Sequence, residues 1–423
     1  MKKLLCFAVS ALMASTLVAC SNDSNAFKPA LDPETKCEIT VVGDYSSFPA
    51  LVSEFERFNA YYPHVDFTYS KVDSYNDTIA TVLERSDKPN IFFTYAYMTG
   101  DAKYSSIFNH TENLSDPALK LDLNCIRPGL LNHDKNGNVV MVPVFSRTYG
   151  ALVNRNLFEK EGISIPNTWD DLLKASDAFV KKGYKSPMMG YSVKDGSCLM
   201  NTIAYPAFVA ALAKNPDALE KANNLDPSAG EYMREALEKV DALIKGGAIN
   251  LEECDKISDN YNKVLLRFLE GDVPMMICAG DTPSGAKKRE SESAAYQASP
   301  FEYAFYPIPL TSQGGYFMDS PSVQFSVNKD CENLDMTNEF MRFLVRSGEL
   351  SNMAAGKGLV TPTKEMSFNS VYAPFGNIPA ERTFSPEVLG VKDPLAAQIR
   401  KASFKVGRGE LTVDEAIAKY GQL

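Results

Sequence analysis

The first part of the chain alternates between short apolar runs of strand length and amphipathic runs of helical period. Its expected elements are strands at residues 37–42, 63–67 and 90–93, with helices at 48–58 and 75–84. Strands alternating with helices predict a parallel, helix-flanked sheet, because each crossover packs a helix onto the sheet. Ligands bind beyond the carboxyl ends of such strands, which here are the loops at residues 43–47 and 94–98.

The centre of the chain predicts a long strand that carries polar side chains. Residues 139–153 are apolar except for Ser146, Arg147 and Tyr149, and Asn136-Gly137 before them indicates a type I′ hairpin turn. Polar side chains inside an apolar strand need hydrogen-bonding partners, and a bound ligand is one source of them. Thr168 then predicts the N-cap of an amphipathic helix.

Beyond Tyr184 the pattern is mainly helical, with further strands at residues 301–310 and 322–327. The expected helices are residues 201–212, 230–245, 259–270, 337–344 and one begun by Thr412. Residues 286–299 are expected to be an exposed helix or loop.

Five motifs in order resemble the extracellular solute-binding proteins of ATP-binding-cassette importers, in particular their sugar-binding, maltose-binding-like group. They are residues 54–63, the crossing strand with Val142-Pro143 and Val153-Asn154, the run 166–172 (PNTWDDL), residues 268–280, and the terminal run 409–416. The resemblance covers nearly everything after residue 36. This sequence differs from the family pattern in two places. It has Val153 where the family usually has an aromatic residue, and it has no Trp near Asp281.

The resemblance implies an α/β protein of two lobes, each a mixed sheet flanked by helices, with crossing strands as the hinge. The implied boundaries are 37–145 with about 309–348 for the first lobe, and 146–308 with about 349–423 for the helix-rich second lobe. Ligand would bind between the lobes of a monomer and close them, and the closed form would dock on the importer's permease. No cofactor and no metal are implied.

The N-terminus predicts an export signal. Residues 1–19 carry two lysines and then an uncharged run too short to span a bilayer, which ends in small residues before Cys20. The sequence LVAC resembles a lipobox, so we expect Cys20 to be lipidated and to hold the protein at the extracytoplasmic face of a bacterial membrane, at the cell surface or in the periplasm. An ordinary signal with an incidental cysteine is the alternative. Residues 21–36 have no periodicity and are expected to be a tether.

Composition narrows the class of partner. The 43 basic and 53 acidic residues give a net charge of −10, which argues against nucleic acid. The eight cysteines show no CxxC pair and no zinc spacing with the three histidines, so disulfides or buried free thiols are expected. No GxSxG, HExxH, Walker or GxGxxG motif is present. A secreted carbohydrate-active enzyme remains the alternative from another class, because carboxylates are abundant.

The candidate ligand-binding residues follow the strand ends, the polar positions of the crossing strand and the resemblance. They are Asp44, Tyr45, Tyr95, Tyr97, Ser146, Arg147, Tyr149, Asp281, Tyr316 and Phe317. Tyrosines suit the C–H faces and hydroxyls of sugars, although core packing explains such aromatics equally well. A carbohydrate, in particular an oligosaccharide, is therefore expected. The positive charge of Arg147 suits an acidic solute, so a non-sugar ligand, acidic or cationic, is the alternative. An ion pair between Arg147 and Asp281 across the cleft would instead satisfy both charges within the protein.

Overall fold

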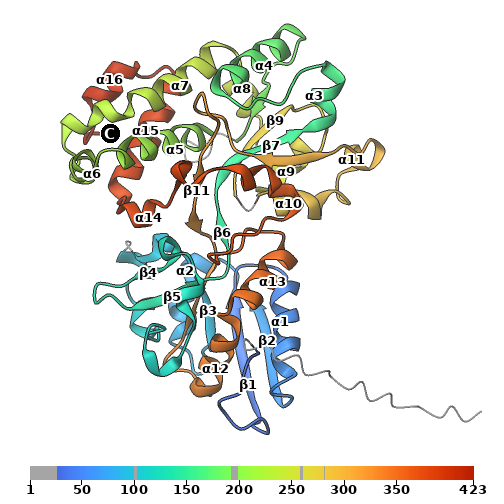
Figure 1. The fold of residues 1–423 in the computed structure, drawn as a ribbon, viewed down its shortest axis with the longest axis vertical. Coiled ribbons are helices and arrows are strands. Elements are labelled where there is room, and N and C mark those ends of the chain that lie inside the picture. Colours follow the sequence, from blue (N-terminus) through green and yellow to red (C-terminus); the bar gives the residue numbers. More distant parts are fainter. Residues whose placement is uncertain (1–25, 100–101, 192–198, 258–260, 281) are drawn as a thin grey trace, which may run out of the picture.

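The computed structural model describes residues 26–99, 102–191, 199–257, 261–280 and 282–423. Two lobes lie one above the other in Figure 1, and several chain segments pass between them near β6 (Ser146–Arg147). Each lobe contains a mixed sheet with helices packed around it, which confirms the α/β fold that the alternating pattern predicts.

The first lobe contains a six-stranded sheet in the order β2-β1-β3-β13-β5-β4. β1 pairs in parallel with β2 and β3, whereas β13 is antiparallel to both β3 and β5. The strands are β1 (Cys37–Gly43), β2 (Val65–Lys71), β3 (Ile91–Thr94), β4 (Asn132–His133), β5 (Val139–Pro143) and β13 (Gln324–Val327), and the helices are α1 (Pro49–Asn59), α2 (Tyr75–Leu83), α12 (Leu334–Leu344) and α13 (Ser347–Lys357).

The second lobe contains a four-stranded sheet in the order β10-β7-β9-β8 and most of the helices. Its strands are β7 (Tyr149–Asn154), β8 (Met188–Met189), β9 (Met275–Ala279) and β10 (Tyr303–Tyr306), with the short pair β11 (Phe317–Met318) and β14 (Thr383–Phe384). Its helices are α3 (Arg155–Glu161), α4 (Trp169–Lys181), α5 (Leu199–Ala213), α6 (Pro216–Asn223), α7 (Arg234–Lys245), α8 (Leu251–Cys254), α9 (Tyr261–Phe268), α10 (Thr282–Arg289), α11 (Ala294–Ala298), α14 (Pro386–Leu389), α15 (Asp393–Gly407) and α16 (Val413–Ala418).

Two predicted helix starts appear as the sequence indicates. The Thr168 hydroxyl accepts a hydrogen bond from the Asp171 N–H at 3.2 Å and so caps α4. Thr412 and Glu415 form a complete capping box at α16. These caps depend on residues three positions apart, which is why local sequence alone predicts them.

The hairpin between β4 and β5 is confirmed, but its predicted turn type is wrong. A type I′ turn needs positive φ at two successive residues, and here only Gly137 has one, at +83°. The Asp134 carboxylate instead accepts hydrogen bonds from the N–H groups of Asn136 and Asn138, which holds the loop in a different shape.

The N-terminal segment is not wholly a tether. The Phe27 ring is 5% exposed and packs edge-on against Tyr61 and Phe343. The Arg342 guanidinium lies 4.4 Å from the centre of that ring and donates to the Lys28 carbonyl. Residues from Phe27 onward therefore belong to the first lobe. The buried aromatic side chain of Phe27 holds this otherwise polar stretch against the lobe.

The helix α13 packs against α1 in the first lobe. We expected the chain to leave this lobe near residue 348, so the observed helix extends the first lobe by about one helix. Glu54 of α1 and Glu349 of α13 meet in this interface with Arg57, whose Nη2 lies 2.6 Å from Glu349 Oε2.

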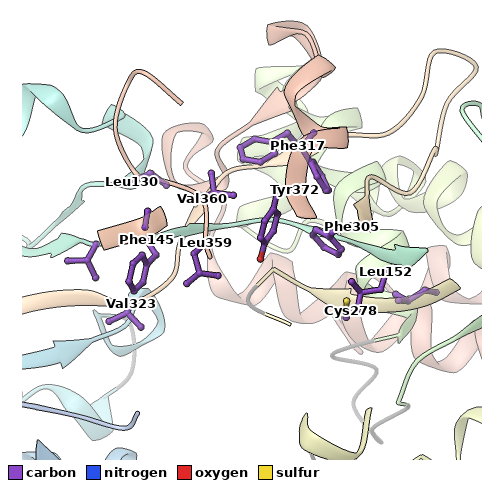
Figure 2. Packing of buried hydrophobic residues seen from close by; sticks show 14 of the residues in the cluster. Leu130, Phe145, Leu152, Cys278, Phe305, Phe317, Val323, Leu359, Val360 and Tyr372 are labelled. Carbon is purple, nitrogen blue, oxygen red and sulfur yellow. The ribbon is translucent and has the colours of Figure 1, made fainter. Parts of the chain in front are cut away.

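One guanidinium with little exposed surface joins the segments that cross between the lobes. Arg127 makes a bidentate ion pair with Asp319, at 2.6 and 2.9 Å. It also donates to the Ser146 hydroxyl at 2.7 Å and to the carbonyl oxygens of Thr361 and Thr363. Apolar side chains surround this crossing, and Figure 2 shows Phe145, Leu359, Val360 and Leu130 gathered on its first-lobe side.

Among the cysteines of the described ranges, Cys37, Cys125, Cys254 and Cys331 are free thiols. Of the two expectations for the cysteines, free thiols therefore apply to these four, whereas Cys6, Cys20 and Cys198 lie outside the described residues. Among the helices that the structure describes, none has the length and apolar character needed to cross a membrane.

Candidate functional site

Two stacked tyrosines follow the end of β3, where the parallel sheet predicts a ligand. The rings of Tyr95 and Tyr97 lie 5.5 Å apart between centres and only 8° from parallel. Tyr97 is 43% exposed, and its hydroxyl donates to the Asn76 side-chain oxygen at 2.9 Å. Tyr97 is thus an exposed aromatic surface that both a stacking partner and a hydrogen bond hold in place.

Asp44, just after β1, lies among tyrosine hydroxyls of the same lobe. Burial raises the pKa of Tyr95 and of Tyr75 well above the usual range, and the negative charge of Asp44 raises both further. Burial raises the pKa of Tyr97 to about 12, with a smaller contribution from Asp44. Asp44 and the tyrosines therefore form one wall that combines a carboxylate acceptor, hydroxyl groups and aromatic faces.

Tyr45 is half-buried and belongs to the same wall. Its ring packs edge-on against Phe48 and Phe93, and its backbone carbonyl accepts a hydrogen bond from the Tyr69 hydroxyl at 2.8 Å. The Lys357 ammonium lies 4.0 Å from the centre of the Tyr45 ring, within range of a cation–π interaction. Tyr45 therefore connects this wall to the end of α13.

The three polar side chains of the crossing strand have different surroundings. Ser146 is fully buried, and because its hydroxyl is bonded to Arg127 it has a structural role here and does not face a ligand. Arg147 is half-buried. Burial raises the pKa of Tyr97 in the first lobe and of Glu387 in the second, and the positive charge of Arg147 partly opposes both rises. Tyr149 packs edge-on against Tyr205 of α5. Arg147 thus stands between the two lobes.

Asp281 lies outside the described residues, so its predicted ion pair with Arg147 stays a prediction. The preceding Gly280 is packed tightly against the crossing strand. A Cβ atom at Gly280 would come within 2.5 Å of the Thr148 backbone nitrogen. Only glycine fits at this contact, which brings the end of β9 close to Arg147.

Phe317 is not placed as a cleft residue. Its ring is 2% exposed and packs against Phe368 and Phe375 in the second lobe. Figure 2 shows Phe317 among the buried hydrophobic side chains, near Tyr372. Tyr316 packs over Phe384, and the negative charge of Glu235 on α7 adds to burial in raising its pKa. Of the two expectations for this aromatic pair, packing at the base of a loop is therefore the one that the structure favours.

Glu387 and Tyr205 face the same region, and the sequence analysis does not identify them. The pKa of Glu387 is raised to about 7, mainly by burial and with a smaller contribution from the charge of Asp319. Ser385-Pro386-Glu387 has the pattern of an ordinary helix start, and Tyr205 lies in a mostly apolar helix. Neither pattern indicates a binding role, because only tertiary packing brings the two residues to the interlobe region.

A pocket of about 840 Å³ lies between the lobes next to Tyr45. The end of α13 lines it from the first lobe, and α10 and β10 line it from the second. Asp44, Tyr95 and Tyr97 do not line this pocket, and Lys357, which lines it, contacts the wall only through the Tyr45 ring. Within the described ranges, no group of His, Cys, Asp and Glu side chains has the arrangement of a metal site.

Comparison with known proteins agrees with this geometry. The model of the family described as "Bacterial extracellular solute-binding protein" matches residues 40–349. The melibiose/raffinose/stachyose-binding protein MelE of Bacillus subtilis (strain 168) is 22% identical over 384 residues, which cover 86% of this chain and 85% of MelE. Both matches are to binding proteins and not to enzymes, which confirms the expected absence of a catalytic role.

Solved structures share the fold at low identity. The binding protein RafE in complex with raffinose has a TM-score of 0.64 and 18% identity, covering 91% of this chain and 99% of RafE. A sugar transporter protein from Bacillus licheniformis in complex with stachyose has a TM-score of 0.57 and 14% identity, covering 91% and 98%. The two-lobed fold is therefore the one that the motifs of the sequence indicate.

Proposed function

Because this chain belongs to the family of bacterial extracellular solute-binding proteins, the binding components of ATP-binding-cassette importers, we propose that it captures an oligosaccharide between its lobes. The observation that carries this proposal is the wall of Asp44, Tyr95 and Tyr97 at the strand ends. Its aromatic faces suit the C–H faces of sugar rings, and its carboxylate accepts hydrogen bonds from sugar hydroxyls. MelE, a relative along most of the chain, is named for binding melibiose, raffinose and stachyose.

The proposed binding of an oligosaccharide uses residues of both lobes. Tyr97 and Asp44 belong to the first lobe, Glu387 and Tyr205 to the second, and Arg147 lies on the crossing between them. A sugar that contacts both walls stabilises the conformation in which the walls are closest, so binding shifts the hinge equilibrium toward closure. The closed form then presents both lobes together to a permease in the membrane.

We place the protein at the outer face of the membrane through a lipid on Cys20. The cysteine follows a signal-like run, and Phe27 is already packed on the first lobe. Only a short length of chain therefore separates the proposed anchor from the folded lobe, which keeps the protein close to its permease.

A thermal-shift screen tests the choice of ligand class. Protein beginning at Ser21 is heated with raffinose, stachyose, xylo- and chito-oligosaccharides, sugar acids, sugar phosphates and polyamines. A solute that binds only the folded state adds about 2.7 kcal/mol at a hundred times its dissociation constant, which shifts the melting temperature clearly. A shift by at least one saccharide is expected. Shifts by polyamines or simple organic acids alone would contradict the carbohydrate proposal.

A further inference from the structure

The pocket between the lobes is lined by basic side chains in an acidic protein. Four basic residues and two acidic residues line it: Arg155, Lys287, Lys288 and Lys357 against Glu290 and Glu302. The whole chain has a net charge of −10. The positive lining is therefore a local departure from the charge of the molecule.

The acidic residues leave part of this positive charge uncompensated. Glu290 is engaged by Lys287 at 2.8 Å and accepts a hydrogen bond from the Tyr303 hydroxyl at 2.9 Å. Over the part of the chain that the structure describes, neither Arg155 nor Lys288 forms an ion pair. The Arg155 Nε donates only to the Tyr306 hydroxyl at 3.2 Å, so the rest of its guanidinium is available to an anion.

The two lobes meet at this pocket, and the pocket adjoins the tyrosine wall. A Cβ atom at Gly358 would lie 3.5 Å from the Ser284 side chain, so the end of α13 touches α10. Figure 1 shows these two helices beside each other at the lobe interface. Lys357, whose ammonium lies on the Tyr45 ring, joins the pocket to the wall where the sugar is proposed to bind.

We propose that this pocket receives an anionic substituent, a carboxylate or a sulfate, of the oligosaccharide bound at the tyrosine wall. The inference rests on the proposed function and narrows its ligand to acidic oligosaccharides. Charge-assisted hydrogen bonds from Arg155 and Lys288 of one lobe and Lys357 of the other hold the anion, and its presence favours closure. A neutral sugar of the same shape leaves these cations without that partner.

Calorimetric titration with paired ligands tests this inference. The pairs are xylotriose with and without a glucuronate branch, the galacturonate trimer with its methyl ester, and neutral with sulfated galactose trimers. In at least one pair the acidic member is expected to bind roughly tenfold tighter or more, and 1 M NaCl should remove most of that advantage. The carboxylate and sulfate pairs distinguish the two kinds of anion.

Variants assign the effect to the pocket. Arg155→Met and Lys288→Met should each reduce the acidic advantage several-fold and leave the affinity for neutral saccharides unchanged. Lys221→Met is the matched control. Lys221 is also an exposed lysine that pairs with no acidic side chain of the described residues, but it lies on α6, away from the pocket.

The outcomes separate the inference from the proposed function. If neutral members bind and no acidic member binds tighter, or if the acidic advantage survives both Met variants, the anion pocket is refuted while carbohydrate capture stands. If no saccharide of either kind binds, both the proposed function and the inference fail.

Discussion

At the scale of single residues, Arg127 is a charged side chain that several polar groups contact at the crossing between the lobes. Its side chain is 12% exposed and pairs with Asp319, which is 6% exposed. It also donates hydrogen bonds to the Ser146 hydroxyl and to the carbonyl oxygens of Thr361 and Thr363. A buried ion pair is not in itself strong evidence of net stabilisation, but removal of one partner leaves an uncompensated buried charge.

Arg127→Met should therefore lower the free energy of unfolding by about 3–5 kcal/mol, because Asp319 keeps its charge without a partner. Urea denaturation measures this loss. Arg408→Met is the control, since Arg408 makes a similar pair with Asp255 at 2.6 Å but at the surface, where about 1 kcal/mol or less is expected. Equal small losses in the two variants would show that the Arg127 cluster does not stabilise the hinge.

Tyr97 represents the residues proposed to touch the sugar. Because the ring is 43% exposed, removing it costs the fold little, whereas a bound sugar loses an aromatic face. Tyr97→Ala should weaken binding of the screened saccharide about tenfold, or ~1.4 kcal/mol, in a calorimetric titration. Tyr232→Ala, which removes a half-buried tyrosine of the second lobe, should leave the affinity unchanged. Unaltered affinity in Tyr97→Ala would exclude Tyr97 from the site.

At the scale of elements, the α1–α13 interface contains two carboxylates that share one arginine. Burial and the nearby charge of Glu349 together raise the pKa of Glu54 to about 8, against the opposing effect of Arg57. The folded protein thus keeps the Glu54 proton at pH values where the unfolded chain has released it. The stability from this group is complete below about pH 4.5 and is lost as the pH rises toward 8.

Glu54→Gln should flatten this pH dependence, because the amide keeps the neutral hydrogen-bonding form at every pH. Melting temperatures between pH 5 and 9 measure it: the wild type should lose stability across that range relative to Glu54→Gln. Glu56→Gln, exposed on the same helix, serves as the control and should follow the wild type. Parallel curves for the wild type and Glu54→Gln would refute the assignment.

The segment from Phe27 is a second test at this scale. A chain that begins at Ala26 should be as stable as one that begins at Ser21, whereas Phe27→Ala should cost about 3 kcal/mol because it empties an aromatic cluster of α1 and α12. Denaturant unfolding of the three proteins measures the difference. If Phe27→Ala unfolds at the wild-type midpoint, the segment is a tether as the sequence analysis expects.

The elements show what sequence can predict. Strands β1 and β3 and helices α1, α2 and α16 follow from periodicity and caps, which are local properties. The Asn136-Gly137 turn type does not, because the Asp134 side chain competes for its backbone N–H groups. The docking of Phe27 depends on partners more than thirty residues away in sequence.

At the scale of the whole molecule, the sequence indicates the two lobes and the region between them through motifs that match a family. It predicts Asp44, Tyr95 and Tyr97 as candidate binding residues, because parallel strands place their carboxyl ends at one edge of the sheet. It does not identify Glu387, Tyr205 or the basic pocket, because these combine segments that only the packed lobes bring together. The sequence also does not show that Tyr97 is exposed and Phe317 is buried. Both are aromatic residues in or just after a strand, so their local patterns are alike.

The central claim is that solute binds between the lobes and closes them. Small-angle X-ray scattering of the free protein and of the protein saturated with the saccharide from the thermal-shift screen tests it directly. The account predicts a smaller radius of gyration with the saccharide and no change with a saccharide that gives no thermal shift. Saturated binding that leaves the scattering curve unaltered would show that the solute does not act by closing the lobes.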